Sequence, residues 1–294
     1  NFNLKGKRLS LWNTDQYAYG KDTNELYKAV PFYMGLQQNI SYGIFFDNTF
    51  KTHFDFCSER RNVTSFWADG GEMNYYFIYG PQMTDVLTTY TDLTGKPELP
   101  PMWALGFHQC KWSYYPESKV KEITSKFREL NFPCDAIYLD IDYMEGFRCF
   151  TWNKEFFPDP KRMVRELEED GFKTVAIIDP GIKIDLSYDV FKEALDKDYF
   201  CRRADGPYMR GKVWPGECYF PDFTNPDVRE WWSGLYRELI GEIGVKGVWN
   251  DMNEPAVMEV PGKTFPLDVR HDYDGHACSH RKAHNIYGMQ MARA

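Results

Sequence analysis

Residues 136–141 read AIYLDI, a nearly continuous apolar run with Asp140 close to its end. Runs of this kind are typical of parallel strands that helices cover on both faces. The stretch 174–178 (TVAII) has the same character, and a shorter apolar stretch follows at 247–249. With the apolar run 103–107 before them, these segments predict four strands of one parallel sheet.

Helical patterns separate these predicted strands. After the first strand, four apolar side chains recur at helical spacing: Val120, Ile123, Phe127 and Leu130. A second helix is predicted to begin at the N-cap Asp159 and to end at Gly171, and a third to begin at the N-cap Asn225 and to end at Gly244. Strands that alternate with helices predict an α/β fold.

Two observations favour a (β/α)8 TIM barrel over a doubly wound sheet. No glycine-rich phosphate-binding turn follows the first predicted strand, as a dinucleotide-binding fold would require. Asp140, Asp179 and Asp251 each close an apolar run, and barrel enzymes hold their catalytic groups at the carboxyl ends of the strands. We therefore predict that residues 96–294 are the first half of a barrel, truncated after strand four.

Residues 1–95 are predicted to be the C-terminal part of a β-sandwich domain. The runs 42–46 (YGIFF) and 74–78 (NYYFI) carry aromatic and branched side chains between turn residues. The stretch 94–101 (TGKPELPP) is rich in proline and glycine and is the best candidate for a linker.

Composition excludes several classes of partner. The net charge is −8 and charges of both signs are interleaved, so we expect neither nucleic acid nor a membrane surface as a partner. No apolar run of about 18 residues is present, and residues 1–8 lack the apolar core of a secretory signal. The seven cysteines are scattered without a C-x-x-C pair, which predicts neither a disulfide framework nor a zinc site and favours a reducing, cytoplasmic compartment.

The stretch 248–255 (VWNDMNEP) places two carboxylates, an amide and an aromatic ring at the end of the fourth strand. Carbohydrate sites need this mixture, because carboxylates act on the acetal, amides bind hydroxyls and an aromatic ring covers the apolar face of a sugar. The alternative, a strand-to-helix turn capped by Asp251, accounts for one aspartate but not for the whole stretch.

This octapeptide resembles the nucleophile signature W-x-D-M-N-E of glycoside hydrolase family 31. The resemblance continues in order along the chain at 139–144 (LDIDYM), 177–181 (IIDPG), 213–216 (VWPG), 219–222 (YFPD) and 284–288 (HNIYG). It implies a retaining α-glycoside hydrolase without a cofactor, most simply an α-glucosidase acting on α-linked oligosaccharides or glucosides. An α-xylosidase, an α-transglucosylase of the same family and a non-catalytic sugar-binding relative stay open as alternatives.

The resemblance also implies roles for single residues. Asp251 would be the nucleophile, Asp140 would bind hydroxyls of the sugar, and Asp15 would lie on the leaving-group side. The sugar subsite would be walled by five side chains: Ile141, Ile178, Trp214, Trp249 and Met252. Asp179 and Glu254 would support neighbouring groups by hydrogen bonds, although the residues alone also allow Asp15 and Asp179 to be turn residues.

Two groupings could suggest a metal. Asp140 and Asp142 would share a face of a strand, but no histidine lies near them in sequence. Four histidines resemble metal spacing only loosely, and we predict solvated or hydroxyl-bonding roles for them: His271, His276, His280 and His284. No metal site is therefore predicted.

In the family, the acid/base aspartate lies on a β/α unit after strand four, beyond Ala294. We therefore expect the remainder of the same enzyme as a partner, either a C-terminal half or a second chain that supplies strands five to eight. The implied reaction is a double displacement through a covalent glycosyl ester on Asp251. Asp140 followed by Ile141 favours a subsite for glucose over one for xylose.

Overall fold

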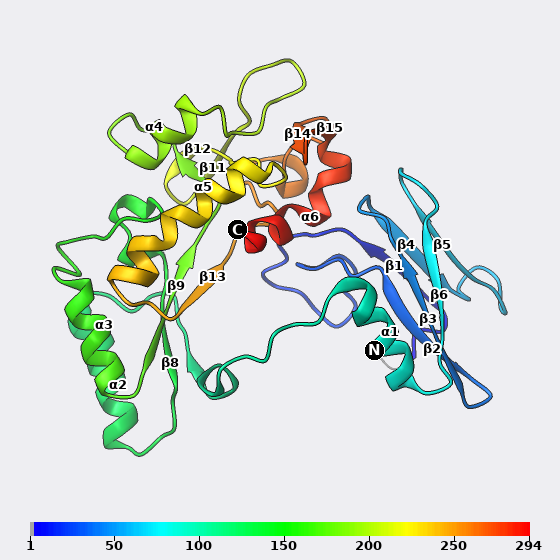
Figure 1. Cartoon of the computed structure of the whole chain (residues 1–294), viewed down its shortest axis with the longest axis horizontal. Coiled ribbons are helices and arrows are strands. Elements are labelled where there is room, and N and C mark those ends of the chain that lie inside the picture. Colours follow the sequence, from blue (N-terminus) through cyan, green and yellow to red (C-terminus); the bar gives the residue numbers. More distant parts are fainter. Residues whose placement is uncertain (1–2) are drawn as a thin grey trace.

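The computed structural model describes residues 3–294 (Figure 1). Residues 1 and 2 of the predicted first domain lie outside the described residues. The N-terminal part holds two small antiparallel sheets, and the rest of the chain is built around a parallel sheet with helices between its strands. None of the helices described for residues 3–294 combines the length and apolar character that a membrane crossing requires.

The two antiparallel sheets each have three strands. The first has the order β1-β4-β5 and the second the order β2-β3-β6; their bounds are β1 (Lys7–Leu11), β2 (Phe32–Gln37), β3 (Ile40–Phe46), β4 (Thr52–Phe56), β5 (Thr64–Ala68) and β6 (Tyr75–Tyr79). The predicted strands at 42–46 and 74–78 are confirmed as β3 and β6. The sheets share a small aromatic core, in which Phe46 of β3 packs with Phe54 and Phe56 of β4.

Helix α1 (Met83–Thr94) follows β6 in a region where the sequence predicted only strands. The helix buries Val86 completely and packs against β3. Its sequence is rich in threonine, a β-branched residue of low helix propensity, so tertiary packing rather than local preference selects the helix. The predicted linker 94–101 begins with the last residue of α1, and its remaining residues 95–101 contain neither helix nor strand.

The parallel sheet has the order β13-β9-β8-β7. Its strands are β7 (His108–Gln109), β8 (Ala136–Leu139), β9 (Lys173–Ile178) and β13 (Gly247–Asn250). The strands lie side by side in the order in which they occur along the chain, without the reversal of order that a doubly wound sheet contains. This uninterrupted progression is what the first half of a (β/α)8 barrel requires.

Three helices connect these strands: α2 (Glu117–Glu129), α3 (Pro160–Glu169) and α5 (Pro226–Tyr236). The predicted caps are confirmed, since Asp159 Oδ1 accepts a hydrogen bond from Arg162 N at 3.0 Å and Asn225 Oδ1 accepts one from Asp227 N at 2.8 Å. Helix α5 continues as a π-helix (Arg237–Glu242) toward the predicted end at Gly244, which has the positive φ of 94° that suits glycine.

Two sequence predictions in this part are wrong in detail. The apolar run 103–107 lies largely in a 3-10 helix (Met102–Leu105), in which Ala104 N donates to the carbonyl of Pro101, and the strand begins only at His108. Leu130 was expected on the buried face of the first helix, but that helix ends at Glu129 and the Leu130 side chain is exposed.

Smaller elements fill the long connections at the carboxyl ends of the strands. They are η2 (Ile141–Tyr143), η3 (Glu145–Phe147), β10 (Ile182–Lys183), α4 (Asp189–Asp196), β11 (Arg210–Val213), β12 (Gly216–Tyr219), η5 (Pro261–Lys263), β14 (Arg270–Tyr273) and β15 (His276–Ser279). The last helix is α6 (His280–Arg293). Figure 1 shows α6, in red, between the parallel sheet and the two antiparallel sheets.

Gly288 lets α6 approach the loop that follows β13. A Cβ atom at this position would lie 2.6 Å from the main-chain oxygen of Asn253, and a main-chain atom cannot move aside cheaply. We predict that Gly288→Ala lowers the free energy of unfolding by about 1–3 kcal/mol because the helix is pushed off the loop. Urea-induced unfolding measures this change.

The matched control is Gly234→Ala. Gly234 lies within α5 and a Cβ there would meet nothing within 4 Å, so the same substitution is expected to raise stability by about 0.5–1 kcal/mol through helix propensity. Wild-type stability of Gly288→Ala would contradict the proposed close approach.

Candidate active site

The parallel register brings three aspartates to one edge of the sheet. Asn250 of β13 pairs with Ile178 of β9, so the residues that follow them, Asp251 and Asp179, leave the sheet at the same level. The backbone N–H of Asp251 donates to the Ile178 carbonyl at 3.3 Å. Asp140 directly follows β8, the other neighbour of β9. The sheet therefore gathers side chains that are far apart in sequence.

Two carboxyl groups of this cluster are strongly perturbed. Burial, together with the negative charges of Asp251, Asp140 and Glu254, raises the pKa of Asp179 to about 8. Burial and the charges of Asp251 and Asp15 raise the pKa of Glu254 to about 7. Asp179 is therefore mostly protonated at neutral pH, and Glu254 is protonated in about half of the molecules.

Asp251 and Asp140 are perturbed in the same direction. Burial raises the pKa of Asp251, and a hydrogen bond from the backbone of Met252 opposes this effect. Burial also raises the pKa of Asp140, which is opposed by the backbone N–H of Ile141 that donates to Asp140 Oδ1 at 2.7 Å. Both carboxylates thus receive a hydrogen bond that favours the ionised form.

Asp179 lacks such a hydrogen bond, and at Glu254 a hydrogen bond from its own backbone only partly opposes the effect of burial. Asp179 Oδ1 and Glu254 Oε2 are buried polar atoms without a hydrogen-bond partner among residues 3–294, and so is Asn250 Oδ1. A buried carboxylate without partners is costly, so the proton stays on the group instead. The proton on Asp179 therefore reduces the negative charge that surrounds Asp251 and Asp140.

The predicted wall residues occupy different depths. Trp249 is partly exposed and meets Tyr138 edge-on, and Trp214 is 38% exposed. Ile141 and Met252 are buried, and Ile178 has no exposed surface at all. In this structure Ile178 belongs to the hydrophobic core, and its contact with a sugar stays a prediction.

Trp112 is a candidate that sequence reasoning missed. Its ring lies 5.7 Å from that of Trp214 and is largely exposed. It follows β7 by three residues and so belongs to the same edge as the three aspartates. Its position shortly after a strand was not recognised, because the first strand was expected at 103–107 and Trp112 is then five residues beyond the strand end.

Asp15 reaches the carboxyl cluster from the N-terminal part of the chain. Its negative charge raises the pKa of both Asp251 and Glu254, which places its carboxylate near them. The Tyr27 hydroxyl donates to Asp15 Oδ1 at 3.5 Å, and Lys263 Nζ donates to the Asp15 carbonyl at 3.4 Å.

A cavity of about 1060 Å³ lies elsewhere, between the antiparallel sheets and the long connections of the barrel. Trp12, Phe50 and Lys51 line one side, and Arg203 and Arg281 are on the other. None of the predicted site residues lines it. The perturbed carboxyl groups, and not this cavity, therefore define the candidate site.

The metal predictions need two corrections. Asp140 and Asp142 do not alternate along a strand, because β8 ends at Leu139 and a 3-10 helix begins at Ile141. The histidines were expected to be solvated or to bind hydroxyls, but three of them are buried away from solvent: His271, His280 and His284. The polar sequence around these histidines indicated contact with solvent. In the structure, however, the rings form hydrogen bonds with one another.

One of these histidines belongs to a group with metal-ligand potential. Cys201, Asp222 and His271 hold possible ligand atoms within 4.8 Å of one another, although the sequence suggested no zinc site. His271 Nδ1 lies 2.9 Å from Asp222 Oδ1, which is a hydrogen-bond distance and shorter than the roughly 3.3 Å between two ligands on a tetrahedral zinc. All seven cysteines are free thiols.

A pH-dependent stability follows from Asp179. Because its pKa is raised from 3.8 to about 8, the folded protein holds this proton between about pH 4 and 8 while the unfolded chain releases it, so stability is lost as pH rises through that window. Asp179→Asn removes the group that ionises. We predict that the melting temperature of the variant gains on that of the wild type from about pH 5 to about pH 8.

Asp189→Asn is the control, because Asp189 is an exposed residue on α4. Thermal unfolding at both pH values should show no pH-dependent difference between this variant and the wild type. A difference between Asp179→Asn and the wild type that does not change with pH would contradict the proton assignment.

Comparison with known proteins agrees with this geometry. Residues 97–294 match the glycosyl hydrolases family 31 TIM-barrel domain, and residues 1–55 match the glycosyl hydrolase 31 N-terminal galactose mutarotase-like domain. Alpha-glucosidase 2 of Bacillus thermoamyloliquefaciens is 45% identical over 291 residues, which are 99% of this chain and 37% of that enzyme. Human neutral alpha-glucosidase AB is 36% identical over 98% of this chain and 33% of its own length.

Solved structures show the same relationship. The family 31 dextranase of Flavobacterium johnsoniae, as a mutant in complex with isomaltotriose, superposes with a TM-score of 0.90 at 38% identity, over 100% of this chain and 35% of that one. The family 31 alpha-glucosidase of Bacteroides thetaiotaomicron has a TM-score of 0.84 at 40% identity, over 98% of this chain and 46% of that one. The chain thus spans between a third and a half of these relatives, and the predicted fold class is confirmed. A family model matched over most of the sequence, with relatives this similar, shows that the chain belongs to glycoside hydrolase family 31.

Proposed function

We propose that the enzyme containing this chain is a retaining α-glycoside hydrolase, and specifically an α-glucosidase, with Asp251 as its nucleophile. The distribution of protons in the carboxyl cluster carries this proposal. Asp251 is partly exposed and receives a backbone hydrogen bond that favours its ionised form, whereas at neutral pH the buried Asp179 is mostly protonated and Glu254 is about half protonated. A nucleophile needs the first environment, because only the carboxylate attacks.

In the proposed first step, a carboxylate oxygen of Asp251 forms a bond to the anomeric carbon of the sugar. The bond from that carbon to the leaving oxygen breaks, and the leaving oxygen takes a proton from a second carboxyl group about 5–5.5 Å from the first. Water then attacks the glycosyl ester, gives its proton to the same second group and releases Asp251. Net retention of configuration follows from two inversions.

Neighbouring side chains would orient the sugar. We assign Asp140 to the sugar hydroxyls, since it follows β8 at the same edge of the sheet as Asp251 and its Oδ1 accepts a hydrogen bond from the Ile141 backbone. The exposed surfaces of Trp214 and Trp249 suit the apolar face of a sugar, and we add Trp112 to this wall. Protonated Asp179 and Glu254 can donate hydrogen bonds toward the ionised members of the cluster.

The choice of α-glucosides rests on the relatives. Several of them are named α-glucosidases, and the dextranase structure contains isomaltotriose. An α-xylosidase or an α-transglucosylase would use the same carboxylates, and a panel of aryl α-glycosides separates these activities by their rates. A non-catalytic sugar-binding protein would not require an ionisable Asp251 beside carboxyl groups that carry protons at neutral pH.

We further propose that residues 1–95 belong to a β-sandwich domain and residues 96–294 to the first half of the barrel. The remainder of the same enzyme would supply strands five to eight and the acid/base group. Two observations support this: the relatives are about two to three times longer than this chain, and β6 exposes Tyr75, Phe77 and Tyr79 on its surface. Such an aromatic surface is typical of a face that another element covers.

Asp251→Asn tests the nucleophile. The amide has nearly the same shape but cannot form the ester, so we predict that turnover of an aryl α-glucoside by the complete enzyme falls by several orders of magnitude. The melting temperature should change little. Asp189→Asn is the matched control and should retain wild-type turnover, and activity of Asp251→Asn within about tenfold of wild type would refute the assignment.

Asp140→Ala tests the sugar-binding role. Removal of a charged acceptor from buried hydroxyls is expected to raise the barrier for glucoside hydrolysis by roughly 2–4 kcal/mol. Steady-state kinetics should show this as a lower kcat/KM, with a glucoside as substrate. Unchanged kinetics would return Asp140 to a purely structural role.

A further inference from the structure

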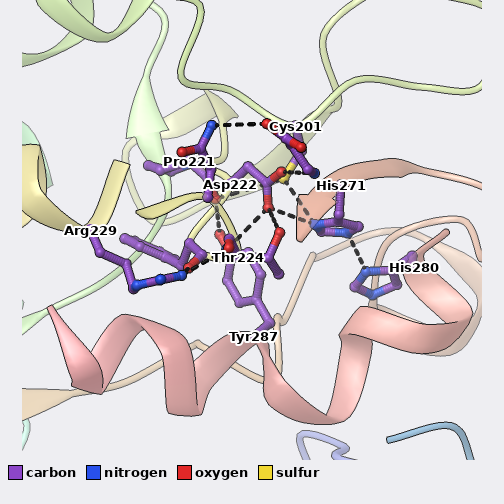
Figure 2. A network of polar contacts seen from close by, with 11 residues as sticks. Cys201, Pro221, Asp222, Thr224, Arg229, His271, His280 and Tyr287 are labelled. Carbon is purple, nitrogen blue, oxygen red and sulfur yellow. Dashed lines mark hydrogen bonds and ion pairs between the residues drawn. The ribbon is translucent and has the colours of Figure 1, made fainter. Parts of the chain in front are cut away.

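Three buried imidazoles, those of His271, His280 and His284, form an unbroken chain of hydrogen bonds. Figure 2 shows the part of this chain that runs from Asp222 through His271 to His280. His271 Nδ1 lies 2.9 Å from Asp222 Oδ1, and His271 Nε2 lies 2.9 Å from His280 Nδ1. His280 Nε2 lies 2.9 Å from His284 Nδ1, and His284 Nε2 lies 2.7 Å from the carbonyl oxygen of Asn13. The three rings are at most 3% exposed. The chain therefore connects the loop after β12 with the N-terminal part of the protein.

A count of protons constrains this chain. It contains four hydrogen bonds, and the groups at its two ends, the Asp222 carboxylate and the Asn13 carbonyl, only accept. A neutral imidazole carries one N–H, so three neutral rings supply three protons for four bonds. Two acceptors would then face each other at less than 3 Å. One additional proton satisfies every bond at once.

The surroundings locate that proton on His271. Burial opposes the charge of Asp222, but the ion pair with His271 and hydrogen bonds from Thr224 and the Asp272 backbone hold its pKa below the usual range. Burial lowers the pKa of His280 and lowers that of His284 to about 3, so both of these rings are neutral. Only His271 lies directly against a carboxylate.

The other end of the chain holds the segment that precedes Asp15. The ring of His284 stacks on Trp12 with a centroid distance of 3.6 Å and an angle of 9° between the ring planes. The next residue, Asn285, accepts a hydrogen bond from Asn13 N at 3.0 Å through its side chain and donates one to the Leu11 carbonyl at 3.2 Å. Two consecutive residues of α6 thus fix residues 11–13, and Asp15 follows two positions later.

We propose that His284 is a positioning residue for Asp15, and that the imidazolium of His271, paired with Asp222, fixes the Nε2–H tautomer with which His284 holds the Asn13 carbonyl. Protonation of His271 at Nδ1 and Nε2 leaves Nδ1 of His280 and of His284 as acceptors. Both neutral rings must then carry their proton on Nε2. The inference rests on the proposed function only in the role given to Asp15, because the proton arrangement stands independently of any activity.

Histidine-selective ¹⁵N solid-state NMR of the complete enzyme tests the proton arrangement. The three signals are assigned by their loss in the single variants His271→Phe, His280→Phe and His284→Phe. The expected result is His271 with both nitrogens protonated and His284 protonated at Nε2 alone. A neutral His271, or a His284 proton on Nδ1, would overturn the arrangement whether or not the enzyme is a glucosidase.

Kinetics of His284 variants test the positioning. His284→Phe keeps a ring to stack on Trp12 but removes the hydrogen bonds of both ring nitrogens, so kcat/KM for an α-linked glucose disaccharide should fall roughly ten- to a hundredfold. An aryl α-glucoside has no leaving-group hydroxyls for Asp15 to bind, and its kcat/KM should stay within about twofold. His284→Gln, whose Nε2 can still donate to the Asn13 carbonyl, should recover most of the loss.

His276→Ala is the control, because His276 is an exposed histidine that takes no part in the hydrogen-bonded row of histidines. This variant should leave kcat/KM for both substrates unchanged. Equal losses for the two substrates in His284→Phe would show a general structural effect and overturn the positioning role. Unchanged kinetics with the disaccharide would overturn it as well. If Asp251 were not the nucleophile, the Asp251→Asn experiment would fail while the NMR result stood.

Discussion

Parallel strands that end at one level place the side chains that follow them in a small, poorly solvated volume. Here β8, β9 and β13 deliver Asp140, Asp179 and Asp251 to that volume, and Glu254 follows three residues later. Like charges at this distance cannot all ionise in a medium of low dielectric constant. The group that loses its proton is therefore decided by local hydrogen bonds, and those bonds favour the ionised forms of Asp251 and Asp140.

Helix α6 connects this cluster to the rest of the chain. At Gly288 it approaches the main chain of Asn253, in the loop that carries Asp251. Four residues earlier, His284 binds the segment that carries Asp15. One rigid element therefore sets the separation between two groups that come from opposite ends of the sequence, with a precision that flexible loops alone would not provide.

Much of the fold was predictable because its signals are local. The caps at Asp159 and Asn225 depend on residues two or three positions away, and the apolar runs of β8 and β9 are continuous. The first barrel strand was predicted at 103–107 (WALGF), because this segment is apolar. It is not extended, since Ala104 N donates to the Pro101 carbonyl within a 3-10 helix. Helix α1 escaped prediction because packing against β3 outweighs its threonine-rich composition.

The candidate site also contains some residues that the sequence reveals and others that only the folded structure reveals. The aspartates that end apolar runs are visible in the sequence, whereas Trp112 becomes visible only once β7 is correctly placed. The histidine chain joins residues 13, 222, 271, 280 and 284. No local pattern contains these five positions, and the polar sequence around 271–284 points toward solvent instead. Long-range hydrogen bonds between buried polar groups are specified by the folded state as a whole.

The proposed mechanism depends on a covalent bond between Asp251 and the sugar. This bond is detected by treating the complete enzyme with a fluorinated α-glucosyl fluoride whose ester hydrolyses slowly, and then locating the adduct by proteolysis and mass spectrometry. We expect one fluorinated glucosyl group on the peptide that contains residues 248–255, attached to Asp251. Attachment to another carboxylate, or turnover of the reagent without any covalent adduct, would contradict it.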